Sequence, residues 1–253
     1  MRTRIHRWRA SLIHLGISAA VAAVVFLAVR WLWYRGALFD EAGGRDLFFL
    51  VVSVDVVLGP LVTLIVYKPG KPGLLFDMIV IGTLQLGALA YGLHVLSVSR
   101  PVYVAFVKDR FELTRAADIE PEDLAAAKGT PYQDLPWTGP RLVGVRFPTD
   151  ADEKFRLMVS GAAGKDIHTY PRYFAPYAET AREAAARAQP LAELRKLNPG
   201  RERLVDDAVA RAGRPEASLG FLPLKTGKHD LAVIIDKSDG GVLEWVGLRP
   251  WTY

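Results

Sequence analysis

Three long apolar runs, residues 10–33, 47–67 and 74–98, occupy most of the first 100 residues of this chain. A helix needs about 20 apolar residues to cross a hydrocarbon layer of ~30 Å. Each run has that length and contains few ionisable residues. The sequence therefore predicts three transmembrane helices, within a membrane domain of residues 1–100, followed by a soluble domain of residues 101–253.

The first run is preceded by the basic segment RTRIHRWR, which would also suit a signal peptide. The run is longer than a typical signal-peptide apolar region, and it ends in RWLWYRG without a small-residue cleavage site. We therefore expect it to be retained as an anchor. Trp31, Trp33 and Tyr34 then predict an aromatic belt at the outer membrane interface.

The distribution of basic residues predicts the orientation of the helices. Basic residues in short loops stay on the cytoplasmic side, and here they precede the first run and lie between the second and third: Arg2, Arg4, Arg7, Arg9, Lys68 and Lys71. The latter two belong to the turn KPGKPG, whose Pro and Gly residues favour a tight reversal. We expect a multi-pass protein of the cell inner membrane, with a cytoplasmic N-terminus and a periplasmic C-terminal domain.

The charge of the chain is concentrated in the membrane part. Residues 1–100 contain 10 Lys and Arg against 5 Asp and Glu, whereas residues 101–253 contain 22 of each kind. A neutral soluble domain argues against a nucleic-acid partner, which requires a basic surface. The absence of cysteine excludes disulfides and thiolate metal sites.

Polar residues within the apolar runs need partners, because an ionisable group inside the bilayer costs a few kcal/mol. At about 1.5 Å per residue, Asp55 and Gln85 lie at similar depths, roughly 18 and 16 Å from the inner surface. His14 and Asp77 both lie roughly 5 Å from that surface. These depths predict an Asp55–Gln85 hydrogen bond and a His14–Asp77 contact. Each of these two contacts has three possible roles: it can hold the helices together, take part in proton or ion transfer, or recognise a partner helix.

The segment DVVLGP, residues 55–60, predicts a disturbed helix. Pro60 lacks a backbone donor and leaves the carbonyl of Val56 unbonded, so a kink is expected. Gly59 allows a neighbour to approach closely. This turn is our candidate notch for a partner helix.

The segments IHLGIS, WYRGALFDEAGG, DVVLGPLVTLIVYKPGKPGLLFD and LQLGALAYGLHVLSVSRPVYVAF occur in order and with matching spacing. Over about residues 5–115 the chain resembles the type IV pilin accessory proteins of the TfpX/TfpZ type. The resemblance implies a cytoplasmic-membrane protein that assists the assembly, stability or dynamics of type IV pili, by acting on the major pilin. It brings no catalytic residues.

Patterns in the soluble domain predict an α+β fold with an antiparallel sheet. A strand or hairpin is expected directly after the membrane exit, then a short helix from Pro121 to Gly129. RLVGVRFP and EKFRLMVSG are strand candidates, and residues 176–188 and 201–213 are helix candidates. The C-terminal segment from residue 219 indicates three short strands joined by turns.

The soluble domain contains no recognisable catalytic motif. His168 and His229 are about 60 residues apart and fit no metal-binding spacing, and Ser160 lacks the nucleophile-elbow pattern. We therefore predict no catalytic, cofactor-binding or metal-binding residues. Tyr170, Arg172 and Tyr173 in HTYPRYFAPY have the composition of a contact surface, or equally of a core.

The favoured hypothesis is a membrane-bound assembly factor with the major pilin and membrane lipids as partners. The alternative is a membrane-embedded enzyme that modifies pilin or lipid, with Asp55 or Asp77 as the acid or base. The two carboxylates lie about 13 Å apart in depth, which counts against that alternative. A sensor would require a cytoplasmic partner, because the inner segments are short.

Overall fold

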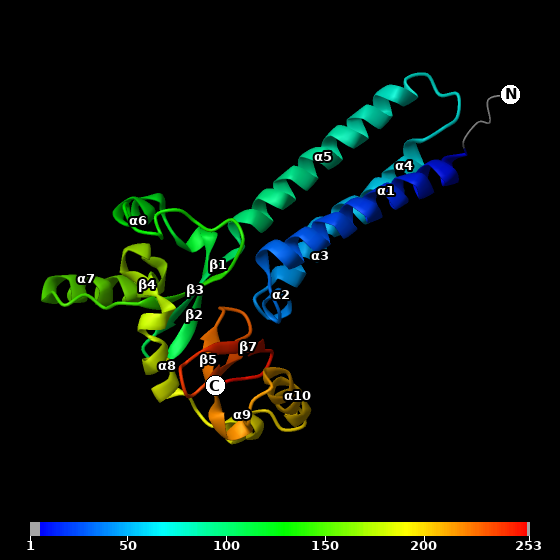
Figure 1. Cartoon of the computed structure of the whole chain (residues 1–253). Coiled ribbons are helices and arrows are strands. Elements are labelled where there is room, and N and C mark those ends of the chain that lie inside the picture. The colour runs from blue at the N-terminus through cyan, green and yellow to red at the C-terminus, as the bar shows by residue number, and fades with distance from the viewer. Residues whose placement is uncertain (1–5, 252–253) are drawn as a thin grey trace. The chain divides into compact units, whose positions relative to one another are not determined.

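The computed structural model describes residues 6–251 and divides the chain into two compact units (Figure 1). The first unit comprises Met1–Trp31 and Gly44–Val98, and the second comprises Leu32–Gly43 and Ser99–Tyr253. The connection between the first two apolar runs thus belongs to the second unit. The sequence had placed residues 32–43 in the membrane domain.

Three helical rods make up the first unit. They consist of α1 (Arg7–Ala28) with the π-helical turn Val29–Trp33, α3 (Gly44–Ser53) with the π-helical turn Val54–Leu58 and α4 (Gly59–Val66), and α5 (Leu74–Val98). All three rods are long and apolar enough to cross a membrane. Many large apolar side chains on them are exposed, as expected of surfaces that face lipid. The three predicted membrane helices are confirmed.

The turn between α4 and α5 follows the predicted chemistry. Gly70 and Gly73 have φ angles of 82° and 79°, which are backbone conformations that favour glycine. Tyr67 takes an extended conformation and ends α4. The two Pro-Gly pairs therefore reverse the chain within a few residues.

A seven-stranded sheet forms the centre of the second unit. Its strands are β1 (Pro101–Val107), β2 (Arg110–Arg115), β3 (Arg141–Val145), β4 (Phe174–Pro176), β5 (Leu219–Lys225), β6 (Leu231–Asp236) and β7 (Val242–Val246). Their order across the sheet is β4-β3-β1-β2-β5-β6-β7. The predicted hairpin after the membrane exit and the three C-terminal strands are all present.

The predicted α+β domain is confirmed, but its sheet is mixed where an antiparallel sheet was expected. The β1–β3 and β2–β5 pairs are parallel, whereas β1–β2, β3–β4, β5–β6 and β6–β7 are antiparallel. Parallel neighbours require long crossovers. The segments that lead to β3 and β5 supply them, because they contain helices.

Six short helices complete the second unit: α2 (Leu38–Glu41), α6 (Pro121–Ala126), α7 (Ala151–Ala162), α8 (Ala181–Arg187), α9 (Leu191–Leu197) and α10 (Glu202–Ala212). Helices α9 and α10 place Leu194 and Val205 against Phe221 and Ile234 of β5 and β6. A second cluster surrounds Tyr103 and Phe174. Apolar burial at these clusters stabilises the domain without disulfides.

Helix α7 corrects one strand prediction, because EKFRLMVSG is helical. The Asp150 carboxylate accepts a hydrogen bond of 2.9 Å from the Glu153 amide and caps the helix. Its apolar residues Phe155, Met158 and Val159 are 61%, 65% and 51% exposed. The segment EKFRLMVSG thus has a composition typical of a strand, but it forms a capped helix with an exposed apolar stripe.

Hydrogen bonds tie the connecting segment 32–43 to the rest of the second unit. Gly139 N donates to Leu32 O (2.9 Å), Trp33 Nε1 to Trp137 O (3.1 Å) and Tyr34 Oη to Ser99 O (3.1 Å). Trp33 and Tyr34 are only 8% and 2% exposed, whereas Trp31 is 76% exposed. The predicted aromatic belt is therefore wrong for Trp33 and Tyr34, which pack in the domain.

Candidate functional site

A cluster of polar side chains surrounds Gly59 among the apolar helices. A Cβ atom at Gly59 would collide with the Gln85 side-chain amide of α5 and lie 3.1 Å from His14 Nε2 of α1. Ser11 Oγ also donates to Pro60 O at 2.8 Å. Helices α1, α4 and α5 therefore meet at this turn, and a larger residue at position 59 would require the Gln85 side chain to move.

The predicted Asp55–Gln85 contact is formed, but through a different atom. Gln85 Nε2 lies 3.5 Å from the backbone carbonyl oxygen of Asp55 and donates to it weakly. The carboxylate atom Oδ1 of Asp55 is buried and has no hydrogen-bond partner within residues 6–251. His14 is close enough to Asp55 for a charge interaction. One oxygen of the Asp55 carboxylate, Oδ1, is thus buried without a hydrogen bond within residues 6–251.

The predicted His14–Asp77 contact is wrong. His14 Nδ1 lies 2.6 Å from Thr63 Oγ1 of α4, and Lys71 Nζ forms a 2.6 Å ion pair with Asp77. Two side chains must lie at equal depth to be in contact. Depth alone does not determine toward which neighbouring helix each side chain points. Lys71 lies six residues before Asp77 in the same turn and satisfies the carboxylate locally.

The expected disturbance at DVVLGP takes the form of a π-helical turn over Val54–Leu58. Such turns accommodate a missing backbone hydrogen bond and recur at functional sites. Gly59 and Pro60 are largely buried, but Gly59 and Gln85 line a shallow apolar groove of about 260 Å³ between residues 54–62 and 81–88.

The aromatic cluster of HTYPRYFAPY is partly core and partly surface. Tyr173 is 8% exposed and donates to Glu153 Oε1 at 2.5 Å. Arg172 is exposed, and its guanidinium lies 5.4 Å and 4.8 Å from the rings of Tyr170 and Tyr173. Of the three predicted contact residues, Arg172 is therefore the one accessible to a partner.

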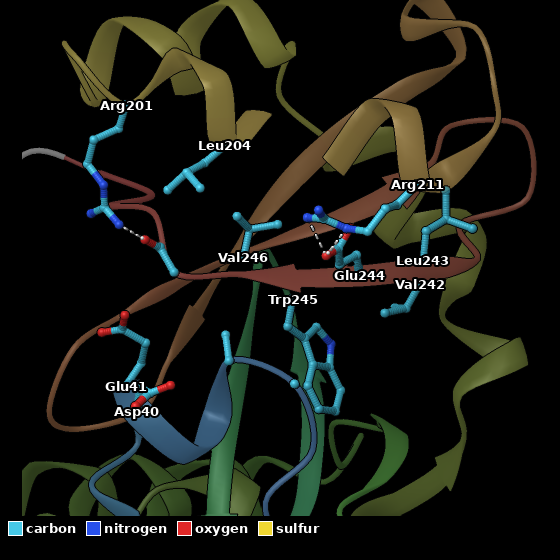
Figure 2. Close-up of a pocket in the computed structure, with 13 residues that line it drawn as sticks. Asp40, Glu41, Arg201, Leu204, Arg211, Val242, Leu243, Glu244, Trp245 and Val246 are labelled. Atoms are coloured by element: carbon cyan, nitrogen blue, oxygen red, sulfur yellow. Dashed lines mark hydrogen bonds and ion pairs between the residues drawn. The ribbon is translucent and has the colours of Figure 1, made fainter. Parts of the chain in front are cut away.

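A groove of the second unit lies along β7 and was not predicted. It has a volume of about 600 Å³ and is bounded by β7, α10 and residues 36–41 (Figure 2). Arg211 of α10 forms an ion pair with Glu244 of β7 at 2.8 Å. Arg201 donates to Gly247 O at 2.7 Å. These bonds tie the two ends of α10 to the middle of β7 and to the residue that follows the strand.

A second depression of about 580 Å³ shares Glu41, Arg201 and Gly247 with this groove. Four cationic residues line it, against two carboxylates: Arg201, Lys225, Lys228 and Arg249, against Glu41 and Asp230. His229 Nδ1 lies 3.3 Å from Glu41 Oε2. The groove along β7 thus opens at one end into a basic depression.

His168 lies in another depression, beside Glu112. Burial lowers the pKa of His168, and the neighbouring Glu112, Asp166 and Asp118 oppose that shift. Its Nδ1 atom is buried and unpartnered among the described residues. Glu112 is 4% exposed and pairs with Arg110 at 2.6 Å. No group of three or more potential metal ligands occurs within residues 6–251.

Comparison with known proteins relates this chain to pilus assembly. Two proteins named fimbrial assembly protein, from Dichelobacter nodosus serogroups I and E1, are each 30% identical over 230 residues, covering 89% of this chain and 89% of theirs. The chain belongs to this fimbrial assembly protein family. A third member, from serogroups C1 and C2, is 33% identical over 117 residues, 46% of this chain and 89% of its own.

The assignment of this chain to a family rests on the fimbrial assembly proteins alone. No family model matches the chain, and no solved structure matches it. The 230 aligned residues exceed the length of either compact unit. Similarity to the fimbrial assembly proteins therefore includes parts of both units, and the resemblance to type IV pilus accessory proteins is confirmed.

One sequence signal could have predicted the groove of this family member. VLEWV follows LAVIID across a short turn rich in Gly and Asp, which predicts a hairpin of these two strands. A strand with one hairpin neighbour leaves its second edge free unless another strand reaches it. Helix α10, which bounds the groove on one side, was predicted from the sequence. Its position beside β7 was not predicted.

Proposed function

We propose that this protein is an inner-membrane assembly factor that binds the major type IV pilin before the pilin enters the fibre, and that it acts by binding and not by catalysis. The observation that carries the proposal is the similarity to fimbrial assembly proteins over 89% of the chain. The three apolar helices agree with a membrane location. In this proposal the second unit lies in the periplasm, as the basic inner loops indicate.

The layout of the chain suits such a partner. A pilin that waits in the membrane has one apolar helix and an outer head, and this protein has apolar helices and a folded domain. Two contacts made through one chain reinforce each other by effective concentration. The groove between residues 54–62 and α5 is the membrane-level candidate, because it is apolar and is lined by Gly59 and Gln85.

Co-purification from membranes tests the proposal. The full chain, tagged and extracted in a mild detergent, is expected to retain the major pilin, whereas an unrelated three-helix membrane protein expressed at the same level is not. Asp55→Asn is expected to reduce the retained pilin without reducing the amount of protein. Retention equal to that of the unrelated protein would refute pilin binding.

A further inference from the structure

The free edge of β7 is the feature that extends the proposed function. Strand β7 is one end of the sheet, and β4 is the other. Strand β4 has only three residues and ends in the exposed Pro176, a combination that protects an edge from pairing. Strand β7 has five residues and contains neither Pro nor Lys. The sheet thus has one edge that is short and contains proline, and a longer edge without proline whose pairing with β6 has one register irregularity.

The groove follows this edge and not one face of the sheet. Six consecutive residues, Val242 to Gly247, all line it. A register irregularity in the β6–β7 pair leaves Leu243 as an extra residue between Val242 and Glu244, and Trp245 and Val246 point to opposite sides of the strand (Figure 2). A strand with one neighbour directs the N–H and C=O groups of alternate residues away from that neighbour. The backbone of β7 therefore offers hydrogen-bonding groups to the groove.

Side chains on both sides of β7 would receive the side chains of an added strand. Leu204, Leu243 and Val246 form an apolar wall on the α10 side (Figure 2). Trp245 points to the opposite side (Figure 2), and its Nε1 donor is buried without an acceptor within residues 6–251. A buried donor without a partner is unfavourable.

The charge at one end of the groove specifies the partner further. The adjoining depression has four cationic residues against two carboxylates, and Lys225 and Arg249 are exposed. A carboxylate on the incoming segment would therefore be attracted there. An extended basic segment would be repelled at the same end.

We propose that the free edge of β7 binds an extended segment of the pilin head by strand addition, with apolar residues along the groove and a carboxylate at its basic end. Main-chain hydrogen bonds supply affinity in this mode, and the side-chain positions supply specificity. That the segment belongs to the pilin rests on the proposed function. The strand-addition site itself rests on the second unit alone.

Filling the groove is the first test. Ala37 lines it from the wall opposite α10 and is half-buried, so Ala37→Trp would occupy the space of the added strand. Ala186→Trp on α8, an exposed position outside the groove, is the matched control. We expect Ala37→Trp to reduce co-purified pilin at least about tenfold and Ala186→Trp to leave it unchanged.

Reversing the charge at the basic end is the second test. Lys225→Glu is expected to reduce the retained pilin about three- to tenfold, and the loss should be largest at low salt. Lys128→Glu, at an exposed position of the same domain that does not line either depression, should have no such effect. Equal losses for both variants would overturn the charge assignment.

Hydrogen exchange and photo-crosslinking provide readouts that do not depend on a damaging substitution. The amides of residues 242–246 should exchange more slowly in the wild-type complex than in the free protein, while those of β4 remain unchanged. A photo-crosslinker at Leu243 should capture pilin. Capture of a second copy of this chain instead would overturn the proposed occupant.

The outcomes separate this inference from the proposed function. If the wild-type chain retains no pilin at all, the proposed function fails. If it retains pilin, but Ala37→Trp behaves like Ala186→Trp and residues 242–246 gain no protection, the pilin binds elsewhere. In that case the strand-addition site is refuted and the assembly role stands.

Discussion

At the scale of single residues, Gly59 shows most directly how the apolar helices pack. An added methyl group at this position would meet Gln85 and His14, and forced overpacking typically costs about 1–3 kcal/mol. Gly59→Ala is therefore expected to lower the thermal unfolding temperature of the detergent-solubilised protein. Differential scanning fluorimetry measures this change.

Gly82→Ala is the matched control, because nothing lies within 4 Å of a Cβ at Gly82 on α5. It should unfold at the wild-type temperature or slightly above it, since Ala favours helix over Gly. Adding Gln85→Ala to Gly59→Ala should recover part of the lost stability. Equal unfolding temperatures for both glycine variants would contradict the packing at this turn.

His168 predicts how the stability of the second unit depends on pH. Burial lowers its native pKa below the ordinary value of about 6.5, so between the two values the unfolded chain binds more protons than the native chain. The contribution of His168 to the free energy of unfolding is therefore fully present above about pH 6.5. It is lost progressively as the pH drops below that value. Unfolding of the full chain by urea at pH 7.5 and pH 5.5, followed at the second unit, measures this decrease.

His168→Gln is the comparison variant for this pH dependence. Thr114 bonds to the backbone carbonyl of His168 and not to its ring, so the substitution keeps that hydrogen bond. The variant should lose less stability than the wild type between the two pH values. An identical pH dependence would show that the decrease has another source, such as the carboxylates near His168.

At the scale of elements, the connecting segment 32–43 unexpectedly forms part of the second unit. Tyr34 is buried and its hydroxyl donates to Ser99 O. Tyr34→Ala should destabilise the second unit by about 3–5 kcal/mol, as for other large buried aromatic side chains. Tyr34→Phe should cost only about 1 kcal/mol, because it removes the hydrogen bond alone. Limited proteolysis of the purified full chain measures both.

Similar proteolysis of Tyr34→Ala and the wild-type chain would contradict the docking of segment 32–43. An exposed substitution in the same segment, Arg35→Ala, offers a reference for the effect of sequence changes there. It should leave the second unit as resistant to protease as the wild type.

The sequence predicted those elements that have strong local signals. The KPGKPG turn, the first hairpin and the helices near residues 181–187 and 202–212 follow from periodicity, glycine positions and end charges. The segment EKFRLMVSG of α7 was assigned as a strand, because its short apolar run at residues 157–159 does not distinguish a strand from a helix. Strand direction is set by which strands meet across the sheet, so the parallel pairs of β3 and β5 could not be read from either segment.

At the scale of the whole molecule, the orientation of the chain in the membrane can be tested cleanly. The sequence has no cysteine, so single-cysteine variants need no other change. Arg187→Cys in α8 and Lys68→Cys in the short basic turn are both exposed positions. A membrane-impermeant maleimide should label Cys at position 187 in intact spheroplasts, and Cys at position 68 only after permeabilisation. The reverse pattern would contradict the proposed topology.

The candidate sites were only partly predictable. Asp55, Gly59 and Gln85 could be found from the sequence because polar and small residues are conspicuous in apolar runs. The similar depths of Asp55 and Gln85 correctly predicted that their two helices are in contact. Depth alone misassigned His14 and Asp77, because it gives no rotation about the helix axis. The β7 groove depends on where a strand, a helix and a distant connecting segment meet, and no local pattern encodes that meeting.

The central claim is that this family member assists pilus assembly by engaging pilin in the membrane. The most direct measurement is the ratio of surface pili to total cellular pilin in a strain that lacks the protein, compared with the same strain complemented by the wild-type chain. The account predicts that surface pili decrease while pilin remains in the cell, and that complementation restores them. Unchanged surface pili and unchanged pilus dynamics in the deletion strain would contradict it.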